Sequence, residues 1–396
     1  MQQVASLLLS FIVGLFGVSG PGQTGRNFGA IEGYYGKPLS LERRISLIRT
    51  MGNIGLNFFM IAPKNEPNLA KRWRDEFPEA FKTEMSQLAG ICKENGVELC
   101  LSISPGSKFN RGEIALLADR AYQLSFYSPN YFTLLFDDIG VLRSSNLGKL
   151  HAEASNAVLS SIRKRNPFAR LLVCPTQYFG NRKSDYLCNF LVNLDRSIIV
   201  FWTGPDVVPE EISGQSFGDF KKMVGRDVAI WDNYPVNDFN PKCLWLGEYC
   251  GRHLSVARDS FGLFLNISER SEISKISLAH FADFLGASPC GSMLAYVMDD
   301  LFPLHKEAAN SLLKIFDVRP GRKTFSWSGV TASFKNDNKS LLKDLLAVAS
   351  LSQVGNKMLE EDLRPWTESA KILSDAISAK KITPNLLDWF PTLKEK

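Results

Sequence analysis

The stretch FTLLFDDIG, from Phe132 to Gly140, gives the clearest indication of how this chain folds. Its first five residues, Phe132–Phe136, are aromatic, β-branched or aliphatic, and two carboxylates follow them directly. A near-continuous apolar run that ends in polar residues is typical of a strand in a parallel sheet that helices cover on both faces. We therefore expect a buried strand here, ending just before Asp137 and Asp138.

The same pattern recurs through the first two thirds of the chain. Eight short apolar runs end in polar residues: Phe28–Glu32, Phe58–Ala62, Leu99–Ser104, Phe132–Phe136, Leu171–Pro175, Ile198–Trp202, Val228–Trp231 and Gly262–Asn266. Amphipathic segments of helical period lie between them, among them Leu41–Met51, Phe81–Asn95, Gly112–Leu124 and Leu150–Lys164. Eight strand–helix units in about 250 residues predict a (β/α)8 TIM barrel. A doubly wound open sheet is the alternative, although the first strand lacks the G-x-G-x-x-G turn of a nucleotide site.

The C-terminal part of the chain has a different pattern. From about Pro303 the apolar runs give way to helical ones, at His305–Phe316, Leu341–Val354 and Pro365–Lys380. We expect an apolar leading segment over residues 1–25, an α/β barrel over residues 26–300 and a small α-helical domain over residues 301–396. The helical domain either caps the barrel or serves to form a homodimer.

Composition restricts the class of protein. Of the 396 residues, 45% are apolar and 22% charged, which is typical of a chain with a packed core and excludes disordered, collagen-like and polytopic membrane proteins. The net charge of +5 is spread over the whole length without a basic run. We therefore expect neither nucleic-acid binding nor stable membrane insertion.

Metal and disulfide chemistry are also disfavoured. The seven cysteines are scattered without a C-x-x-C pair, and no two of the four histidines have H-x-x-x-H spacing. A zinc site would need ligand pairs of this kind, and a disulfide framework would need an even, regularly spaced set of cysteines. We expect mostly buried free thiols, and no metal or organic cofactor.

The functional residues should lie where the strands end, because the loops after the strands build the site of such a barrel. The polar and aromatic residues at these ends include Glu32, Gly33, Tyr35, Lys64, Asp137, Asp138, Gln177, Tyr178, Thr203, Trp231, Asp232, Asn233 and Asn266. They contain neither a Ser–His pair nor a set of metal ligands. Aromatic faces combined with amides and carboxylates suit a neutral, polyhydroxylated ligand, so the sequence indicates a carbohydrate.

Asp137 and Asp138 are the strongest candidates for chemistry. Two adjacent carboxylates repel each other when both are ionised, so we expect one pKa to be raised, which would make a general acid at neutral pH. A solvated loop pair or a helix N-cap is the structural alternative. Consecutive residues rarely lie about 5 Å apart on opposite sides of a glycosidic bond, as a nucleophile and an acid must. The pair fits better with hydrolysis in which the sugar's own acetamido group is the nucleophile.

Seven motifs carry a resemblance to a known family. They are IEGYYGKP (Ile31–Pro38), APK (Ala62–Lys64), SISPG (Ser102–Gly106), LLFDDIG (Leu134–Gly140), CPTQY (Cys174–Tyr178), WTGPDVV (Trp202–Val208) and WDNYPVND (Trp231–Asp238). In this order they resemble glycoside hydrolase family 84, which contains bacterial β-N-acetylglucosaminidases and animal O-GlcNAcases. The resemblance covers residues 28–285, the whole expected barrel, whereas the C-terminal helices resemble the family only in kind.

The resemblance implies two catalytic residues. Asp137 would orient and polarise the N–H of the acetamido group, and Asp138 would act first as general acid and then as general base. Gln177 departs from the family, in which Glu is common at this position. Because Gln177 neighbours the matching positions and replaces none of them, we expect it to affect the substrate edge and the pH optimum more than the reaction.

By the same resemblance, four residues would bind sugar hydroxyls. Gly33 and Lys64 would bind hydroxyls directly, and Asp238 and Asn266 would hold those at the far edge of the ring. Plain structural roles are the alternatives, with Gly33 in a tight turn and Lys64 at a solvated strand end.

Four other residues would shape the pocket around the reacting group. Tyr178 would contact the acetamido oxygen, while Trp231 and Tyr35 would surround its methyl group and the anomeric centre. Asn233 would support the catalytic carboxylates. Trp231 could equally be a residue of the apolar core.

Together these features imply a retaining exo-β-N-acetylglucosaminidase acting on an N-acetylglucosaminylated protein or glycan. Three alternatives stay open. A chitin- or hyaluronan-type hexosaminidase would need a long aromatic groove instead of a pocket closed by Asp238. A non-catalytic N-acetylglucosamine-binding barrel is the second, and the intact Asp137-Asp138 pair argues against it. A helical scaffold with a vestigial barrel is the third.

The N-terminus bears on location. Residues 1–25 carry no charged side chain, and Val4–Val18 is nearly all apolar, as in the core of a signal peptide, but no Lys or Arg precedes it. We expect secretion if residues 1–20 act as a signal peptide. The unpaired thiols favour a cytoplasmic location, and so does the sequon at Asn266, where a glycan would fill the expected sugar site.

Overall fold

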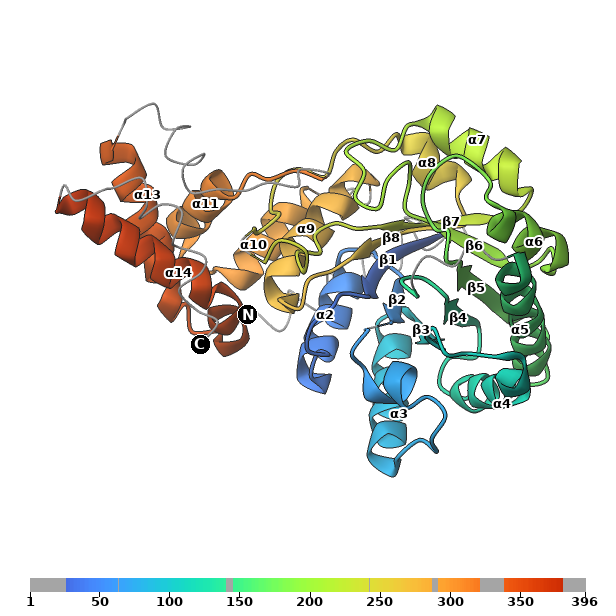
Figure 1. The fold of residues 1–396 in the computed structure, drawn as a ribbon. Coiled ribbons are helices and arrows are strands. Elements are labelled where there is room, and N and C mark those ends of the chain that lie inside the picture. Colours follow the sequence, from blue (N-terminus) through green and yellow to red (C-terminus); the bar gives the residue numbers. More distant parts are fainter. Residues whose placement is uncertain are drawn as a thin grey trace, which may run out of the picture.

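The computed structural model describes residues 26–62, 64–139, 145–241, 243–286, 291–320 and 338–379. They form a closed barrel inside a ring of helices, and a group of C-terminal helices extends to one side of it (Figure 1). The expected leading segment, residues 1–25, lies outside the described residues, so its nature stays a prediction.

Eight parallel strands make the barrel in chain order, and the first strand pairs with the last. They are β1 (Asn27–Glu32), β2 (Phe58–Ile61), β3 (Glu98–Ile103), β4 (Tyr131–Leu135), β5 (Arg170–Cys174), β6 (Ile199–Trp202), β7 (Val228–Asp232) and β8 (Gly262–Asn266). Each coincides with one of the eight apolar runs to within one residue at either end. The (β/α)8 barrel is therefore confirmed, and pairing of β1 with β8 rules out the open sheet.

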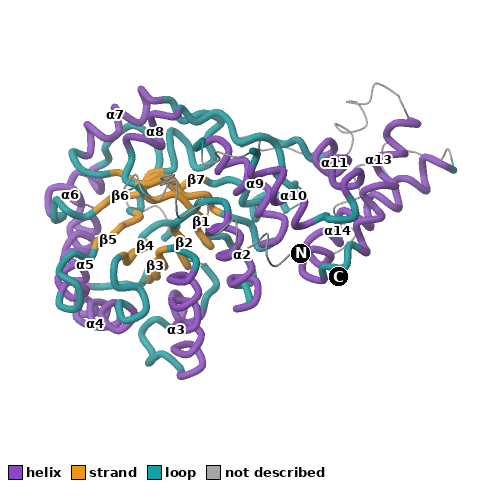
Figure 2. Tube along the Cα trace, turned by 180° about the vertical axis from the view of Figure 1, so that it is seen from behind, coloured by secondary structure: helices purple, strands orange, loops and turns teal. Residues whose placement is uncertain are grey.

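Helices follow the strands along the chain and surround them, as Figure 2 shows from behind. They are α2 (Leu41–Asn53), α3 (Glu79–Glu94), α4 (Ile114–Leu124), α5 (Ser145–Arg163), α6 (Asp185–Asn193), α7 (Gly214–Val224), α8 (Leu254–Asp259) and α9 (Ser271–Phe284). Local sequence explains several helix ends. Ser40, Ser184 and Ser213 each accept the backbone N–H three residues further on and so cap α2, α6 and α7. Gly225 ends α7 in the left-handed conformation.

Side-chain alternation along the strands divides the apolar core into two parts. Phe58, Phe201, Trp231 and Phe264 point inward and fill the barrel. The rings of Phe201 and Trp231 meet edge to face with their centroids 5.6 Å apart. The side chains that alternate with them point outward and pack beneath the helices in a larger cluster. The barrel is thus a filled core, and only its carboxyl end is available for a site.

Among its described residues, the C-terminal region contains the helices α10 (Met293–Leu301), α11 (Lys306–Ile315), α13 (Asn338–Ser350) and α14 (Lys357–Ser378). The expected helices at His305–Phe316 and Leu341–Val354 correspond to α11 and to α13 with the short 3-10 turn that follows it. The expected boundary near residue 300 stays a prediction. Helix α10 runs across this position and packs on α9.

The start of α14 was predicted wrongly. The helix begins at Lys357, eight residues before Pro365, which lies inside it. The predicted segment, Pro365–Lys380, begins at this proline, and a proline inside a helix removes a backbone hydrogen bond. Asn356 caps the real start by accepting the N–H of Leu359, and the buried face that includes Leu363 and Trp366 stabilises the helix despite the missing bond.

Charged contacts join the helical region to the barrel. Arg43 on α2 donates to Asp362 on α14 at 2.8 Å and to the neighbouring Glu361 at 2.9 Å. Asp362 also accepts the N–H of Glu272 in the first turn of α9 at 2.8 Å. The C-terminal helices therefore pack on the barrel. Within the described ranges, no helix combines the length and the apolar content that crossing a membrane requires.

Candidate active site

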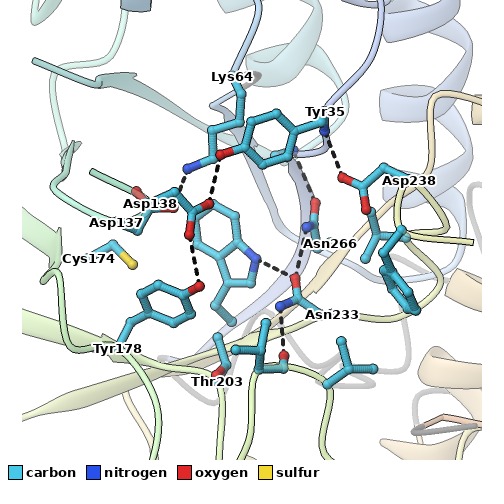
Figure 3. Close-up of a pocket in the computed structure, with 16 residues that line it drawn as sticks. Tyr35, Lys64, Asp137, Asp138, Cys174, Tyr178, Thr203, Asn233, Asp238 and Asn266 are labelled. Carbon is cyan, nitrogen blue, oxygen red and sulfur yellow. Dashed lines mark hydrogen bonds and ion pairs between the residues drawn. The ribbon is translucent and has the colours of Figure 1, made fainter. Parts of the chain in front are cut away.

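A pocket of about 300 Å³ lies at the carboxyl ends of the strands (Figure 3). All ten residues that were assigned to a site from the sequence line it: Gly33, Tyr35, Lys64, Asp137, Asp138, Tyr178, Trp231, Asn233, Asp238 and Asn266. They follow or end six different strands, and Gly33 and Asn266, which touch, are 233 positions apart. Closure of the barrel brings these residues together.

The two carboxylate oxygens of Asp137 have different surroundings. Its Oδ2 atom forms an ion pair with the ammonium of Lys64. Its Oδ1 atom is buried and has no hydrogen-bond partner among the described residues. Burial by itself would lower the pKa of Lys64, but the adjacent Asp137 carboxylate outweighs burial and raises that pKa, so Lys64 stays charged. Because a buried acceptor without a donor is costly, this oxygen is suited to accept a hydrogen bond from a ligand.

Asp138 is held between two phenols. Its Oδ2 accepts the hydroxyl of Tyr35 and its Oδ1 that of Tyr178, each at 2.9 Å (Figure 3). Burial and the negative charge of Asp138 raise the pKa of both tyrosines, so both remain hydrogen-bond donors. The backbone at Asp138 has φ +54°, in the left-handed region that few non-glycine residues adopt. Two hydrogen bonds from tyrosine hydroxyls and a positive φ therefore define the position of the Asp138 carboxylate.

Amide groups form another wall of the pocket. Asn233 Oδ1 accepts Nε1–H of Trp231 at 3.0 Å and the Nδ2 group of Asn266 at 2.9 Å. The Nδ2 group of Asn233 donates to the carbonyl of Val207. Asn266 Oδ1 in turn accepts the N–H of Gly33 at 3.1 Å. Asn233 is expected from the sequence to support the carboxylates. Its amide contacts Trp231 and Asn266 instead and orients these two side chains.

Gly33 and Trp231 fit together at the centre of this wall. A Cβ atom on Gly33 would overlap the Trp231 ring, so only glycine allows this approach. Trp231 is therefore both a core residue of the barrel and part of the pocket lining.

Asp238 closes one side of the pocket. Its Oδ2 accepts the backbone N–H of Tyr35 at 2.7 Å, which ties the loop after β7 to the loop after β1. Burial raises its pKa above the ordinary value. The contact places a half-buried acceptor opposite the carboxylate pair (Figure 3).

Three polar residues expected to converge with these do not line the pocket. Glu32 points outward and forms two hydrogen bonds with Arg44, at 2.8 and 2.9 Å. Asp232 does the same with Arg252, with both bonds at 2.7 Å. Gln177 bonds within its own loop, to Ser184 and Arg182. Successive side chains of a strand point to opposite sides. Glu32 and Asp232 directly follow the inward-facing Ile31 and Trp231 and therefore point to the helices.

Six lining residues were given no role from the sequence: Cys174, Thr203, Val207, Val208, Val236 and Phe239. Most lie inside motifs already noted, and Thr203, which directly follows β6, was named only among the residues at strand ends. Phe239 lies in none of these motifs, so no sequence signal indicated it. It is 46% exposed, and its ring lies 4.9 Å from that of Trp245.

The described residues offer little to a metal ion. No three His, Cys, Asp or Glu side chains among them lie close enough to hold one. Of the six described cysteines, four are buried, and burial raises the pKa of Cys174, the one in the pocket, well above its ordinary value. Cys174 is thus an uncharged thiol beside the carboxylates.

A closed parallel barrel with paired carboxylates, amides and aromatic rings in one pocket fits the class of barrel glycoside hydrolases. The family model described as beta-N-acetylglucosaminidase matches residues 28–316. The chain belongs to this family.

Two curated relatives and one solved structure are similar to the chain. The protein O-GlcNAcases of Rattus norvegicus and Mus musculus are each 30% identical over 288 residues, which cover 69% of this chain and 31% of the relative. The chain thus spans about a third of the length of these relatives. The structure of a mutant O-GlcNAc hydrolase from Thermobaculum terrenum superposes with a TM-score of 0.77 at 24% identity, covering 90% of this chain and 84% of the other. This similarity to the Thermobaculum terrenum structure is a similarity of fold.

Proposed function

We propose that this protein hydrolyses terminal β-linked N-acetylglucosamine, with the acetamido group of the sugar as the nucleophile. The observation that carries the proposal is Asp137, which lines the pocket and whose buried Oδ1 atom has no donor among the described residues. An N-acetyl sugar supplies one, the acetamido N–H. Lys64 holds the other oxygen of Asp137 and keeps this carboxylate in place.

In the first step, the carbonyl oxygen of the acetamido group forms a bond to the anomeric carbon while the glycosidic bond breaks. The acetamido nitrogen gains positive charge in this step, and the Asp137 carboxylate stabilises it. Asp138 gives its proton to the departing oxygen, as a general acid. The product is a bicyclic oxazolinium ion, which keeps its N–H proton beside the Asp137 carboxylate and remains in the pocket.

In the second step, water attacks the anomeric carbon and the oxazoline ring opens. Asp138, now an anion, takes a proton from that water. The hydroxyls of Tyr35 and Tyr178 stabilise this anionic form, because each donates a hydrogen bond to it. Retention of configuration follows, because the anomeric carbon is attacked twice.

The natural aglycone is proposed to be a protein side chain. The rat and mouse relatives are named protein O-GlcNAcases, and the pocket volume of about 300 Å³ lies at the lower end of the range for small-molecule sites. A pocket of this size suits one sugar ring, and Asp238 closes one of its sides. Tyr35 and Phe239, 54% and 46% exposed, offer aromatic surface at its rim to a variable aglycone.

Fluorination of the acetamido group tests the nucleophile. Replacing its methyl hydrogens with one to three fluorines withdraws electrons from the carbonyl oxygen and hardly changes its size. The rate on an aryl β-N-acetylglucosaminide should fall by roughly 10²-fold or more across the series, equivalent to about 2.7 kcal/mol of barrier. A flat rate, or a covalent adduct on an acidic side chain found by mass spectrometry, would contradict substrate-assisted hydrolysis.

A comparison of substrates tests the aglycone. An O-GlcNAc-modified protein should be deglycosylated faster than a chitin oligomer, because the pocket accepts one terminal sugar. Faster cleavage of the oligomer would favour the chitin-type alternative. Binding of N-acetylglucosamine without turnover of any substrate would identify a sugar-binding barrel instead.

A further inference from the structure

Behind the carboxylate pair lies a chain of contacts made by His151, Tyr186, Thr176 and Phe136, none of which lines the pocket. His151 on α5 is buried, and its ring stacks on that of Phe136 with the centroids 3.9 Å apart and the planes 8° apart. Its Nδ1 atom lies 2.9 Å from the hydroxyl of Tyr186 on α6. Phe136 is the residue directly before Asp137.

The contacts continue from Tyr186 back to the end of β4. The Tyr186 oxygen accepts the N–H of Thr176 at 3.1 Å. The hydroxyl of Thr176 donates to the carbonyl of Phe136 at 2.8 Å, and the N–H of Phe136 donates to the carbonyl of Cys174 on β5 at 2.8 Å. Phe136 is therefore held at its ring and at both polar groups of its backbone.

Burial determines the charge state of the histidine. The Tyr186 oxygen accepts the N–H of Thr176 and lies 2.9 Å from Nδ1 of His151, and a neutral imidazole either accepts the Tyr186 proton at Nδ1 or donates its own proton there. Burial lowers the pKa of His151 to about 3, so this neutral form persists at physiological pH.

The approach of the two helices depends on a glycine. Gly148 lies one turn before His151 on α5, and a Cβ atom there would overlap the backbone carbonyl of Tyr186. Glycine at this position therefore allows the close approach of α5 and α6 beside Tyr186. Figure 1 shows α5 and α6 side by side next to β4 and β5.

We propose that His151, Tyr186 and Thr176 form a positioning bridge, which fixes Phe136 and so sets where Asp137 and Asp138 stand in the pocket. The pair needs such a support because Asp138 has a positive φ, a conformation that persists only where the surroundings enforce it. The inference rests on the function proposed above. The bridge residues touch neither the sugar pocket nor Asp138, so they act through Phe136 and are not catalytic residues.

Thr176→Val removes the bond to the Phe136 carbonyl while keeping the shape of the side chain. The measurement is kcat and KM on two aryl β-N-acetylglucosaminides, one with a good and one with a poor leaving group. We expect kcat on the poor leaving group to fall roughly 10- to 100-fold, as for a displaced catalytic group. The good leaving group should lose less, because it needs little protonation. KM should stay near its wild-type value, because Thr176 does not line the pocket.

Thr133→Val is the matched control. Thr133 is a buried residue of β4, the strand that Phe136 directly follows. Its hydroxyl lies against the Sγ of Cys100, and it does not line the pocket. The chemical change is the same, so a general loss of packing or stability would appear in both variants. We expect the control to keep the wild-type kcat and the wild-type ratio between the two substrates.

Tyr186→Phe supplies the second variant and a double-mutant cycle. Tyr186 and Thr176 act in one chain of contacts, so the double variant should lose little more activity than the worse single variant. Fully additive losses, equal losses on both substrates, or the same loss in Thr133→Val would overturn the positioning role. If wild-type protein turned over no N-acetylglucosaminide at all, the proposed function would fail first, which keeps the two conclusions distinguishable.

Discussion

Two kinds of carboxylate occupy the carboxyl ends of the barrel strands, and their surroundings are opposite. Glu32 and Asp232 point outward, are fully buried, and share both oxygens with an arginine. Asp137 and Asp138 face the pocket, and one oxygen of Asp137 has no partner among the described residues. Both oxygens of each outward carboxylate are hydrogen-bonded to an arginine, so these residues are structural. The inward pair retains one oxygen, Oδ1 of Asp137, that can accept a hydrogen bond from a ligand.

The comparison shows that residue type and position at a strand end do not by themselves assign a role. Asp232 lies between Trp231 and Asn233, both of which line the pocket. A single step along the chain changes the side of the sheet that a residue faces. Substitutions in the two sets should therefore damage different properties, namely turnover for the inward pair and folding stability for the outward pair.

The largest effect should come from the inward pair. Asp138→Ala should slow hydrolysis of substrates with poor leaving groups by about 10²–10⁴-fold, the usual contribution of a general acid, and should slow good leaving groups much less. Asp137→Ala should slow all substrates alike, since charge on the oxazoline must be stabilised whatever leaves. Kinetics across a series of aryl leaving groups measure this, and parallel losses in the two variants would contradict the assignment.

The next largest effect should come from the outward set. Asp232→Asn leaves the buried guanidinium of Arg252 without its charged partner, which should lower the free energy of unfolding by about 3–5 kcal/mol. Urea unfolding measures the change, and Asp227→Asn, in an exposed pair with Arg170, is the control, with an expected change below about 1 kcal/mol. If Asp232→Asn instead reduced kcat at unchanged stability, the division between the two sets would be wrong.

Asp238→Ala tests the closed side of the pocket. It removes an acceptor for sugar hydroxyls, so kcat/KM should fall by the equivalent of about 1–3 kcal/mol, and discrimination between gluco and galacto epimers should weaken. Steady-state kinetics on both epimers measure the change. The exposed Asp259, paired with Arg258 outside the pocket, provides a control whose alanine variant should behave as wild type. Wild-type epimer preference in Asp238→Ala would remove this residue from the site.

The smallest effect concerns the outer layer behind Asp137 and depends on pH. Burial lowers the pKa of His151 to about 3, so below about pH 6.5 the unfolded chain takes up a proton that the folded protein does not. Stability should then fall as pH falls. Between pH 7 and pH 5 the wild type should lose about 2 kcal/mol more than His151→Gln, which lacks this group. Urea unfolding at both pH values measures this, and equal losses in the two proteins would show that His151 is not buried in neutral form.

The fold was largely predictable because its signals are local. Each strand of a helix-covered parallel sheet carries an apolar run, and each run could be read without its neighbours, to within one residue. The start of α14 was missed because packing of Leu363 and Trp366 against other helices stabilises a helix through Pro365. Propensity alone gives no account of such packing.

The members of the site were also predictable, since strand ends of a closed barrel meet at one face and the motifs lie there. The amino-acid sequence by itself therefore predicted the barrel and ten of the sixteen residues that line the pocket, the carboxylate pair among them. The tertiary structure alone determined which groups form contacts. Tyr35 and Tyr178 donate to Asp138, and Lys64 pairs with one oxygen of Asp137. Asn233 accepts a hydrogen bond from Trp231 instead of contacting the carboxylates. The physical reason is that hydrogen bonds depend on direction and on distances of about 3 Å. Such distances between segments far apart in the chain follow from barrel closure and from the side of each strand that a residue faces.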